Sequence, residues 1–459
     1  MSKRLSVFIA VFALGATVLG GTVGLDLTFN GSGYQIQSFS SDGAFAASVA
    51  LQSNGRIVVG GTQLVSNNIG DYAAMRLLST GGLDNTFDLD GRVSTSLGPF
   101  DISSSLVIQP DGKIILGGER YSGTSNNDFA AVRYNSDGTL DNSFDLNGVV
   151  ATNRNGFSDE HSYGMALQTD GKLVLVGTTA FSTMPGENFP TDLMIVRYNP
   201  NGSLDATFNG NGILVVSFQD VNESANAVVI QPDGKILIGG YLFNGFKNDF
   251  LMMRFMSNGM LDTSFGTGGL VISSINGSNN SISTLAIQVD GRIIAGGSIT
   301  NSSALVRYES NGTIDTTFGN GGVVNVNQSI AKIILMDDAK ILVGGSLGAR
   351  FAVSRYGTDG STDSTFNNGQ PVTPLIPNQQ CVGNSIAVQN DGKIVIVGTC
   401  FNQNASQNSM VVARLVESRN EAPFDFDGDG KTDVGIFRPG DGTWWWRRSS
   451  DSVVPVVQF

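Results

Sequence analysis

The 459-residue sequence contains one histidine, two cysteines and only 15% charged residues. A histidine-dependent catalytic triad would have to use His161, which disfavours that class of enzyme. Two cysteines at hairpin spacing do not make a zinc site. The sequence also lacks helical periodicity, so no glycine-rich phosphate loop opens a helix. We therefore expect a protein that is not an enzyme.

Long hydrophobic runs are also lacking, except at the N-terminus. Lys3 and Arg4 precede an apolar run from Leu5 to Leu19, and small residues follow it. This order is typical of a secretory signal, and the run is short for a membrane span. We assign residues 1–24 to a signal peptide, with a retained membrane anchor as the alternative. The mature protein should be secreted or at the bacterial cell surface, without membrane insertion.

Positive charge is scarce, and the formal net charge is −13. A surface this acidic repels nucleic acid and anionic lipid. We therefore exclude nucleic acid as a partner and expect cations or neutral ligands instead.

Repetition is abundant in this chain, and repeats take precedence over length in assigning domains. The phrase Leu-Asp-x-x-Phe, with small variations, occurs seven times. The most direct role for its phenylalanine is in the core between repeats. The seven copies contain Asp26 and Phe29, Asp84 and Phe87, Asp141 and Phe144, Asp205 and Phe208, Asp262 and Phe265, Asp315 and Phe318, and Asp363 and Phe366.

A second phrase, Gln-x-Asp-Gly-Lys, alternates with the first and is followed by an apolar run and glycine. Its Asp-Gly pair favours a tight hairpin turn, because such turns need a left-handed backbone. A degenerate copy lies at Met336–Lys340. The other copies begin at Gln52, Gln109, Gln168, Gln231, Gln288 and Gln389.

Each repeat reads as four short strands, which in one unit cover residues 149–152, 163–168, 172–177 and 193–198. Seven such units predict an all-β fold, a seven-bladed β-propeller of four-stranded antiparallel blades over residues 25–416. A β-solenoid is the alternative, although its usual coils are shorter than these units.

Paired charges indicate that the ring is closed. An arginine in each predicted fourth strand precedes the next repeat aspartate by eight residues, except at the two ends. Arg414 lacks a following aspartate and Asp26 lacks a preceding arginine, so we predict that they pair with each other. Alternatively, each aspartate caps its own turn and each arginine lies at the surface. The other predicted pairs are Arg76–Asp84, Arg133–Asp141, Arg197–Asp205, Arg254–Asp262, Arg307–Asp315 and Arg355–Asp363.

The two cysteines, Cys381 and Cys400, flank a predicted hairpin turn at residues 390–392. Counting back from the turn places them nearly opposite each other, close enough for a disulfide in an exported protein. Two buried free thiols are the alternative.

The two phrases together resemble those of the delta-60 repeat family of bacterial exported proteins. The resemblance covers about residues 25–416 and implies a repeat fold and export, with no assigned activity. The degenerate copy at Met336–Lys340 departs from the family pattern, so the sixth blade is the one that matches this pattern least well.

The residue composition and the repeat pattern change after residue 416. Residues 417–423 read as a linker, and residues 424–459 as a partial C-terminal β repeat. Its acidic, glycine-containing loop places oxygen ligands at spacings that suit Ca²⁺, whereas an EF-hand would need flanking helices. The segment also resembles FG-GAP or VCBS repeats, whose matching loop binds calcium. An acidic solvated turn is the alternative. The candidate ligands are Asp425, Asp427, Asp429, Asp433 and the carbonyl of Lys431.

Binding is the function that these features favour. The loops at Glu119–Asn127 and Thr178–Thr191 are long and fall on one face of the predicted propeller, where variable loops usually carry recognition. We expect a monomeric binding, adhesion or scaffold module for an unknown extracellular protein or polysaccharide. The alternative is an extracellular carbohydrate-active hydrolase or lyase that uses propeller carboxylates.

Overall fold

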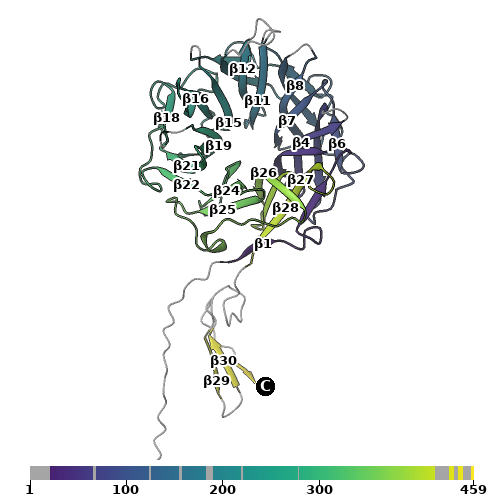
Figure 1. The fold of residues 1–459 in the computed structure, drawn as a ribbon, viewed down its shortest axis with the longest axis vertical. Coiled ribbons are helices and arrows are strands. Elements are labelled where there is room, and N and C mark those ends of the chain that lie inside the picture. Colours follow the sequence, from purple (N-terminus) through teal and green to yellow (C-terminus); the bar gives the residue numbers. More distant parts are fainter. Residues whose placement is uncertain are drawn as a thin grey trace, which may run out of the picture.

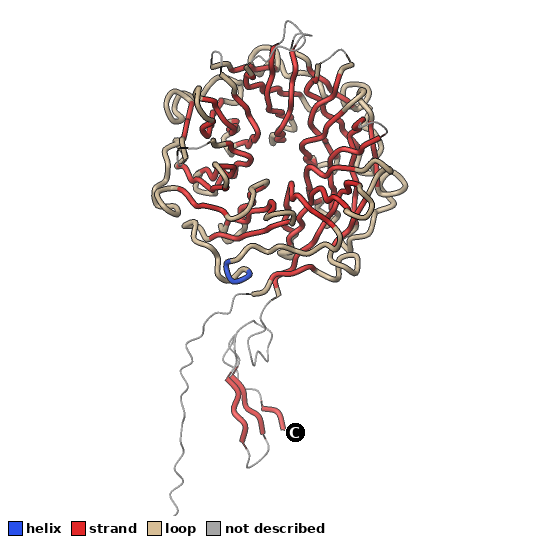
Figure 2. The backbone as a smooth tube through the Cα atoms, in the orientation of Figure 1, coloured by secondary structure: helices blue, strands red, loops and turns tan. Residues whose placement is uncertain are grey.

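The computed structural model describes residues 21–418, with gaps at 66–68, 124–125, 155–157, 182–189, 219–220, 276 and 278, and three strands within 434–458. Residues 21–418 form a ring of seven antiparallel sheets (Figure 1). The predicted seven-bladed β-propeller is therefore confirmed. Strands and loops make up the described part of the ring, where Asn367–Gly369 forms a short helical turn (Figure 2). Within these described residues, no helix is long and apolar enough to cross a membrane.

Five blades have four named strands, numbered from the channel outward. Blade 1 contains β3 (Ala44–Leu51), β4 (Ile57–Val65), β5 (Ile69–Leu77) and β6 (Arg92–Thr95). Blade 2 contains β7 (Asp101–Ile108), β8 (Ile114–Tyr121), β9 (Asn127–Tyr134) and β10 (Val149–Thr152). Blade 3 contains β11 (Ser158–Leu167), β12 (Leu173–Phe181), β13 (Thr191–Tyr198) and β14 (Ile213–Val216).

The remaining blades follow the same order. Blade 4 contains β15 (Glu223–Ile230), β16 (Ile236–Phe243), β17 (Asn248–Phe255) and β18 (Leu270–Ser273). Blade 5 contains β19 (Ser281–Ile287), β20 (Ile293–Ile299), β21 (Ser302–Tyr308) and β22 (Val323–Val326). Blade 6 contains β23 (Lys332–Leu335), β24 (Ile341–Ser346) and β25 (Phe351–Tyr356). Blade 7 contains β26 (Gln379–Val388), β27 (Ile394–Asn402), β28 (Gln407–Glu417), β1 (Val23–Leu25) and β2 (Tyr34–Gln37).

The outermost strand of each complete blade differs from the sequence assignment. Residues 149–152, expected as the first strand of a unit, form β10 and pair with β9 of the preceding blade. That assignment is wrong because the turn after β9 reverses the chain, and Leu140 already bridges back to Tyr134. The loops still lie on the expected faces of the ring. The correction only assigns this strand to the preceding blade instead of the following one.

Blade 7 closes the ring with strands from both ends of the propeller. Strands β1 and β2 both pair antiparallel with β28, with Leu25 opposite Leu415 and Ile36 opposite Val411. Figure 1 shows β1 beside β28 at the lower edge of the ring. The N-terminal segment thus supplies the outer strand that the last repeat lacks. Strand β1 begins at Val23, two residues before the expected start of the propeller.

Blade 6 has the least regular outer edge. Its fourth position contains one bridge, between Val353 and Val372. Pro371 and Pro374 flank Val372, and proline has no N–H to donate to a strand ladder. The prolines therefore limit this edge to a single pair of residues.

The hydrophobic core is divided among the seven interfaces between blades. Each interface has its own cluster of buried side chains, and each cluster contains one repeat phenylalanine. All seven rings are at most 1% exposed. The repeat phenylalanine is thus a core residue between blades, and its burial excludes direct contact with a ligand at the surface.

A glycine ends the apolar run of every second strand and faces the innermost strand. In blade 2 the register shifts between Ser103 and Ser105, and the bulge brings Ile102 O against Gly118. A Cβ atom at Gly118 would lie 2.0 Å from that oxygen. The same approach, at 1.8 to 2.0 Å, occurs at Gly61, Gly118, Gly177, Gly240, Gly297, Gly345 and Gly398.

The C-terminal segment contributes three described strands. Strand β30 (Thr443–Arg447) pairs with both β29 (Val434–Arg438) and β31 (Val456–Gln458). The linker and the predicted calcium loop lie outside the described residues, as do residues 1–20 of the predicted signal peptide.

Candidate functional site

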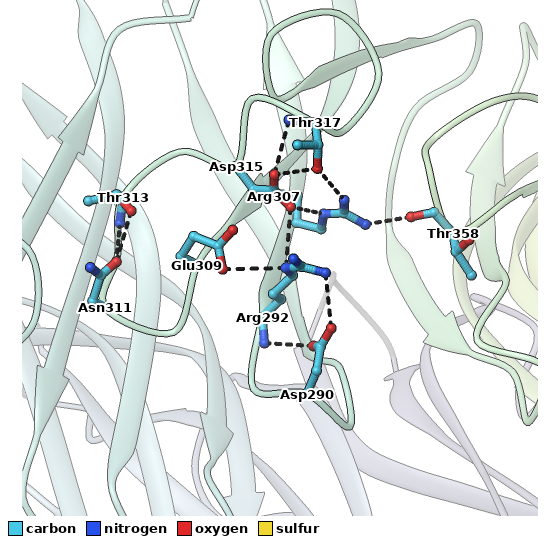
Figure 3. Close-up of polar contacts among 9 residues, drawn as sticks. All are labelled: Asp290, Arg292, Arg307, Glu309, Asn311, Thr313, Asp315, Thr317 and Thr358. Atoms are coloured by element: carbon cyan, nitrogen blue, oxygen red, sulfur yellow. Dashed lines mark hydrogen bonds and ion pairs between the residues drawn. The ribbon is translucent and has the colours of Figure 1, made fainter.

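The paired charges of the repeats lie in clusters between blades. In blade 5, Arg307 on β21 donates through Nε to Asp315 Oδ2 at 2.7 Å (Figure 3). The other Asp315 oxygen accepts from the Thr317 hydroxyl at 2.6 Å. The Arg307 guanidinium also lies 4.6 Å from the centre of the Phe318 ring. One arginine therefore holds together the turn, the acid and the core ring of its repeat.

All seven predicted pairs are in contact in the same way. Arginine Nε lies 2.6 to 2.8 Å from aspartate Oδ2 in each, including Arg414 and Asp26 at the ring closure. Burial raises the pKa of Asp205, but hydrogen bonds from Thr207 and the charge of Arg197 outweigh it and lower the pKa to about 2. Such acids stay ionised at neutral pH, so the pairs carry full charge.

The second phrase of the repeat supplies another cation to the same acid. Arg292, two residues after the start of its Asp-Gly turn, lies 3.3 Å from Asp315 Oδ2 (Figure 3). Lys113 likewise lies 2.9 Å from Asp141 Oδ2. The two sequence phrases are thus two parts of one cluster, a connection that their order along the chain does not reveal.

Each arginine also reaches the next blade. Arg254 donates through Nη1 to the carbonyl of Ser310, in the outer turn of blade 5, at 2.7 Å. In blade 6 no such turn follows within the described chain, because blade 7 takes its outer strand from the N-terminus. There Arg355 contacts the Glu417 carboxylate instead, at 2.9 Å. A side chain therefore replaces the backbone carbonyl at the ring junction.

The cysteines also meet where the hairpin count predicts. Cys381 on β26 lies directly opposite Cys400 on β27, and the two form a disulfide. It joins the two strands at the end of blade 7 that carries the variable loops.

The predicted metal ligands Asp425, Asp427, Asp429, Lys431 and Asp433 lie outside the described residues. Among the residues that are described, no group of three or more acidic, histidine or cysteine side chains is arranged to hold a metal ion. The calcium site stays a prediction.

The face with the variable loops has an uneven rim. In each blade, the backbone carbonyl of one rim residue faces the glycine that ends the apolar run of the second strand. These seven rim residues occupy equivalent backbone positions. Three consecutive blades carry apolar side chains there, one carries histidine and three carry serine. In the order of blades 7 and 1 to 6, these residues are Val382, Phe45, Ile102, His161, Ser224, Ser281 and Ser329.

Two adjoining hollows, here called the rim trough, lie over the apolar part of this rim. They measure about 470 and 530 Å³ and share Phe45, Asn384 and Thr399. Val382 is 55% exposed, and Phe45 and Phe401 are 38% and 39% exposed. Sequence analysis missed the trough because its residues are single positions at the ends of different strands. Its remaining lining residues are Ala46, Ala47, Thr62, Leu64, Phe100, Ile102, Ser103, Ser104, Gly348, Ala349, Gln380, Cys381, Val382, Phe401 and Asn408.

His161 lies on the same rim, in the blade next to the trough, and is not one of the residues that line the trough. Its Nδ1 lies 2.8 Å from Glu119 Oε2, and its Nε2 lies 3.3 Å from Asp159 Oδ2. Hydrogen bonds with Asp159 and Glu119 raise the pKa of His161 to about 10. The ring is therefore an imidazolium at neutral pH, and it is a poor general base in this state.

Three buried carboxyls lie beneath the rim, at equivalent positions in three blades. Each belongs to the residue directly before the rim residue of its blade. Asp101, Glu160 and Glu223 are each 0% exposed. Asp101 accepts from the backbone N–H of Leu97 at 2.6 Å, and Glu223 accepts from that of Phe218 at 2.9 Å. Burial raises the pKa of Asp101 to about 6 and those of Glu160 and Glu223 to about 7.

These raised values predict that stability falls as the pH rises from about 5 to 7. The folded chain binds more protons than the unfolded chain in this window, so each group's stabilisation is complete below its unfolded pKa and is lost through its folded pKa. Glu160→Gln should flatten the decline and raise the melting temperature at pH 8, because it removes a buried charge. Blades 5 and 6 carry the amides Asn280 and Gln328 at this level.

Thermal melts at pH 5 and pH 8 would measure this difference. Asn280→Asp is the converse control and should steepen the decline. An equal loss of stability at both pH values in Glu160→Gln would contradict the assignment.

The central channel is lined by the seven innermost strands and encloses about 150 Å³. Its lining is mostly small and polar, with hydroxyls from Ser48, Ser105, Thr284 and Ser385. Lys332 is the one charged residue among the described lining. The channel and the trough share Ala47, Ser104 and Asn384 as lining residues, so the two spaces adjoin.

The sequence matches one family, described as "Domain of unknown function (DUF5122) beta-propeller". Six of the seven matched segments end at a repeat phenylalanine. The last ends at residue 415, because the strands that complete its blade, β1 and β2, come from the N-terminal end of the ring. No curated protein matches the sequence. The matched segments are residues 52–87, 109–144, 168–208, 231–265, 288–318, 338–366 and 389–415.

Several solved structures are similar over most of the chain. Virginiamycin B lyase from Staphylococcus aureus is 11% identical, with a TM-score of 0.46 over 83% of this chain and 99% of that chain. Polysaccharide lyase Uly1 is 10% identical, with a TM-score of 0.47 over 81% and 89%. Sqt1 from Chaetomium thermophilum is 12% identical, with a TM-score of 0.44 over 84% and 97%. At this level of identity, the similarity concerns the fold alone.

Proposed function

Because the chain belongs to the DUF5122 beta-propeller family, a family of repeat propellers, we propose that it is an exported binding module whose rim trough holds a polysaccharide. The observation that carries this proposal is the exposed apolar surface on three adjacent blades of an otherwise polar rim. Contiguous exposed apolar surface on a rigid frame is typical of an interaction site.

The chemistry of the trough suggests an uncharged ligand. Phenylalanine rings at Phe45, Phe100 and Phe401 offer apolar faces to the C–H groups of a sugar, and the amides of Gln380 and Asn384 can bond its hydroxyls. The described lining of the trough contains no ionisable side chain, because the sulfur of Cys381 is in the disulfide. A net charge of −13 further disfavours an acidic polymer.

Phe45→Ala and Phe401→Ala should each weaken polysaccharide binding by roughly tenfold or more, as expected for central anchors of an interface. A glycan array on the purified protein would identify the ligand, and titration calorimetry would measure the change. Phe246→Ala is the matched control, because Phe246 is 95% exposed in a loop of the same face in blade 4. Binding that survives both trough substitutions, or selection of a protein partner instead of a glycan, would contradict this proposal.

The alternative is a hydrolase or lyase that uses the rim carboxylates. The cluster of His161 with Glu119 and Asp159 is the arrangement that would support it. Since the imidazolium is already protonated at neutral pH, it would serve as an electrostatic contact more readily than as a base. A hydrolase and lyase panel, run with His161→Gln as the comparison, separates the two functions.

Calcium binding in the C-terminal loop and export by the N-terminal segment stay part of this proposal. Both concern residues outside the described ring. The binding experiments above depend on neither of them.

A further inference from the structure

One position near the start of each third strand, at the edge of the face with the variable loops, changes the sign of its charge at blade 6. The position lies five residues before the paired arginine of its blade. Blades 1 to 4 carry aspartate there, and blades 5 and 7 carry serine. Blade 6 carries Arg350, in the short turn between β24 and β25. In order from blade 1, the residues are Asp71, Asp128, Asp192, Asp249, Ser302, Arg350 and Ser409.

Arg350 also differs from most cations of the ring because it has no acidic partner. Every other lysine and arginine in the described ring, except Lys332 in the central channel, forms an ion pair with a carboxylate. Arg350 is exposed at the surface. Its guanidinium is therefore available to pair with an external anion.

Arg350 lines a third hollow, of about 600 Å³, that continues the rim trough. This hollow shares Gly348, Ala349 and Gln380 with the hollow of about 530 Å³ in the trough. Asn378 adds an amide side chain, and Arg350 is the one ionisable residue of the described lining. The surface thus runs from the uncharged trough to a single positive charge at blade 6.

We propose that Arg350 binds an anionic substituent of the polysaccharide, a carboxylate or a sulfate ester, and so sets the direction of the chain in the trough. This proposal rests on the trough as the binding site of a polysaccharide. The planar guanidinium can donate two parallel hydrogen bonds to the oxygens of such a group. It would add a directional contact to a surface that otherwise offers apolar and amide groups.

The opposite end of the trough, between blades 1 and 2, carries negative charge instead. Phe100 and Ile102 line that end, and the buried Asp101 lies between them in the chain. Asp71 of blade 1 stands at the position equivalent to Arg350. An anionic unit would be repelled at that end and attracted at blade 6. The ligand should therefore be a largely neutral chain with sparse anionic units, in agreement with the uncharged trough and the acidic protein.

A glycan array with matched pairs of oligosaccharides tests this proposal. One member of each pair is neutral, and the other bears a single uronic acid or a single sulfate ester. The protein should bind the anionic member about tenfold more strongly, and added salt should reduce this preference. Arg350→Gln should lower binding of the anionic member to the level of the neutral member. Arg92→Gln is the control and should keep the preference, because Arg92 lies on β6 and already pairs with Asp90 at 2.7 Å.

Equal binding of both members in every pair, or a preference that survives in Arg350→Gln, would overturn this proposal and leave the trough as a glycan site. Phe45→Ala should weaken both members of a pair together, because it removes an apolar contact that they share. A protein that binds no glycan on the array would reject the trough itself, and this proposal with it. The pairs that show the preference identify the group as a carboxylate or a sulfate ester.

Discussion

Gly240→Ala should destabilise the propeller by more than about 4 kcal/mol, the range reserved for severe backbone or core conflicts. The new Cβ atom would lie 1.8 Å from the carbonyl oxygen of Ser224. This oxygen belongs to the backbone of the innermost strand, so no change of side-chain rotamer relieves the contact. Strands β15 and β16 would have to separate at the bulge, with loss of their ladder. Chemical denaturation followed by circular dichroism measures the effect.

The neighbouring glycine provides the control. Blades 3 and 7 carry Val176 and Val397 at the position that corresponds to Gly239. A Cβ at Gly239 would approach the ends of the Ile282 and Leu285 side chains at 3.0 Å, and these can adjust. Gly239→Ala should therefore cost much less than Gly240→Ala. Similar losses in the two variants would refute the close-approach explanation.

Breaking the pair between Asp26 and Arg414 should destabilise the ring by about 3–5 kcal/mol, because either single change leaves a buried charge without its main partner. The Arg414 side chain donates to Asp26 at 2.8 Å, and to the Ser79 carbonyl of blade 1 at 2.5 Å. Asp26→Asn and Arg414→Gln, made singly and together, form a double-mutant cycle. The combined loss should be smaller than the sum of the single losses, and strictly additive losses would reject the pairing.

Hydrogen exchange would separate ring closure from ordinary pairing. Asp26 and Arg414 are 388 positions apart, whereas Asp205 and Arg197 are 8 apart in a continuous repeat. Asp26→Asn should speed exchange of the β1 and β2 amides, which only β28 holds. Asp205→Asn is the internal control and should leave those amides protected. Equal protection of β1 and β2 in both variants would mean that this pair does not hold the closure.

Much of the ring was predictable because residues that contact each other recur at fixed spacings in the repeats. The spacing of Arg76 and Asp84, and the unmatched Arg414 and Asp26, placed seven pairs correctly in sequence and led to a closed ring. The strand order within a blade was less accessible. Residues 149–152 were assigned as the first strand of a unit. The order of strands along the chain does not reveal that the turn after β9 brings these residues back to pair with β9.

The candidate sites were harder to predict because they break the repeat instead of following it. Phe45 and Arg350 stand alone in unremarkable segments, and each gains meaning only when seven equivalent positions are compared around the ring. Glu160 looks like a surface acid next to His161, yet it is fully buried. Aligning the seven repeats on the glycine that ends the apolar run of each second strand, and on the paired arginine of each third strand, would have revealed these exceptions in the sequence.

The junction of the ring has one further consequence. Ser418 N donates to the carbonyl of Thr22 at 2.8 Å, so the two ends of the described ring touch. Apart from the Glu417 carboxylate, the arginine-to-carbonyl contacts at this junction are those made between the other blades. A few added residues could therefore join the ends, and the chain could be reopened at another outer turn, such as Asp137–Gly138. The propeller is in this sense a circularly permutable scaffold, whose first and last described residues lie side by side.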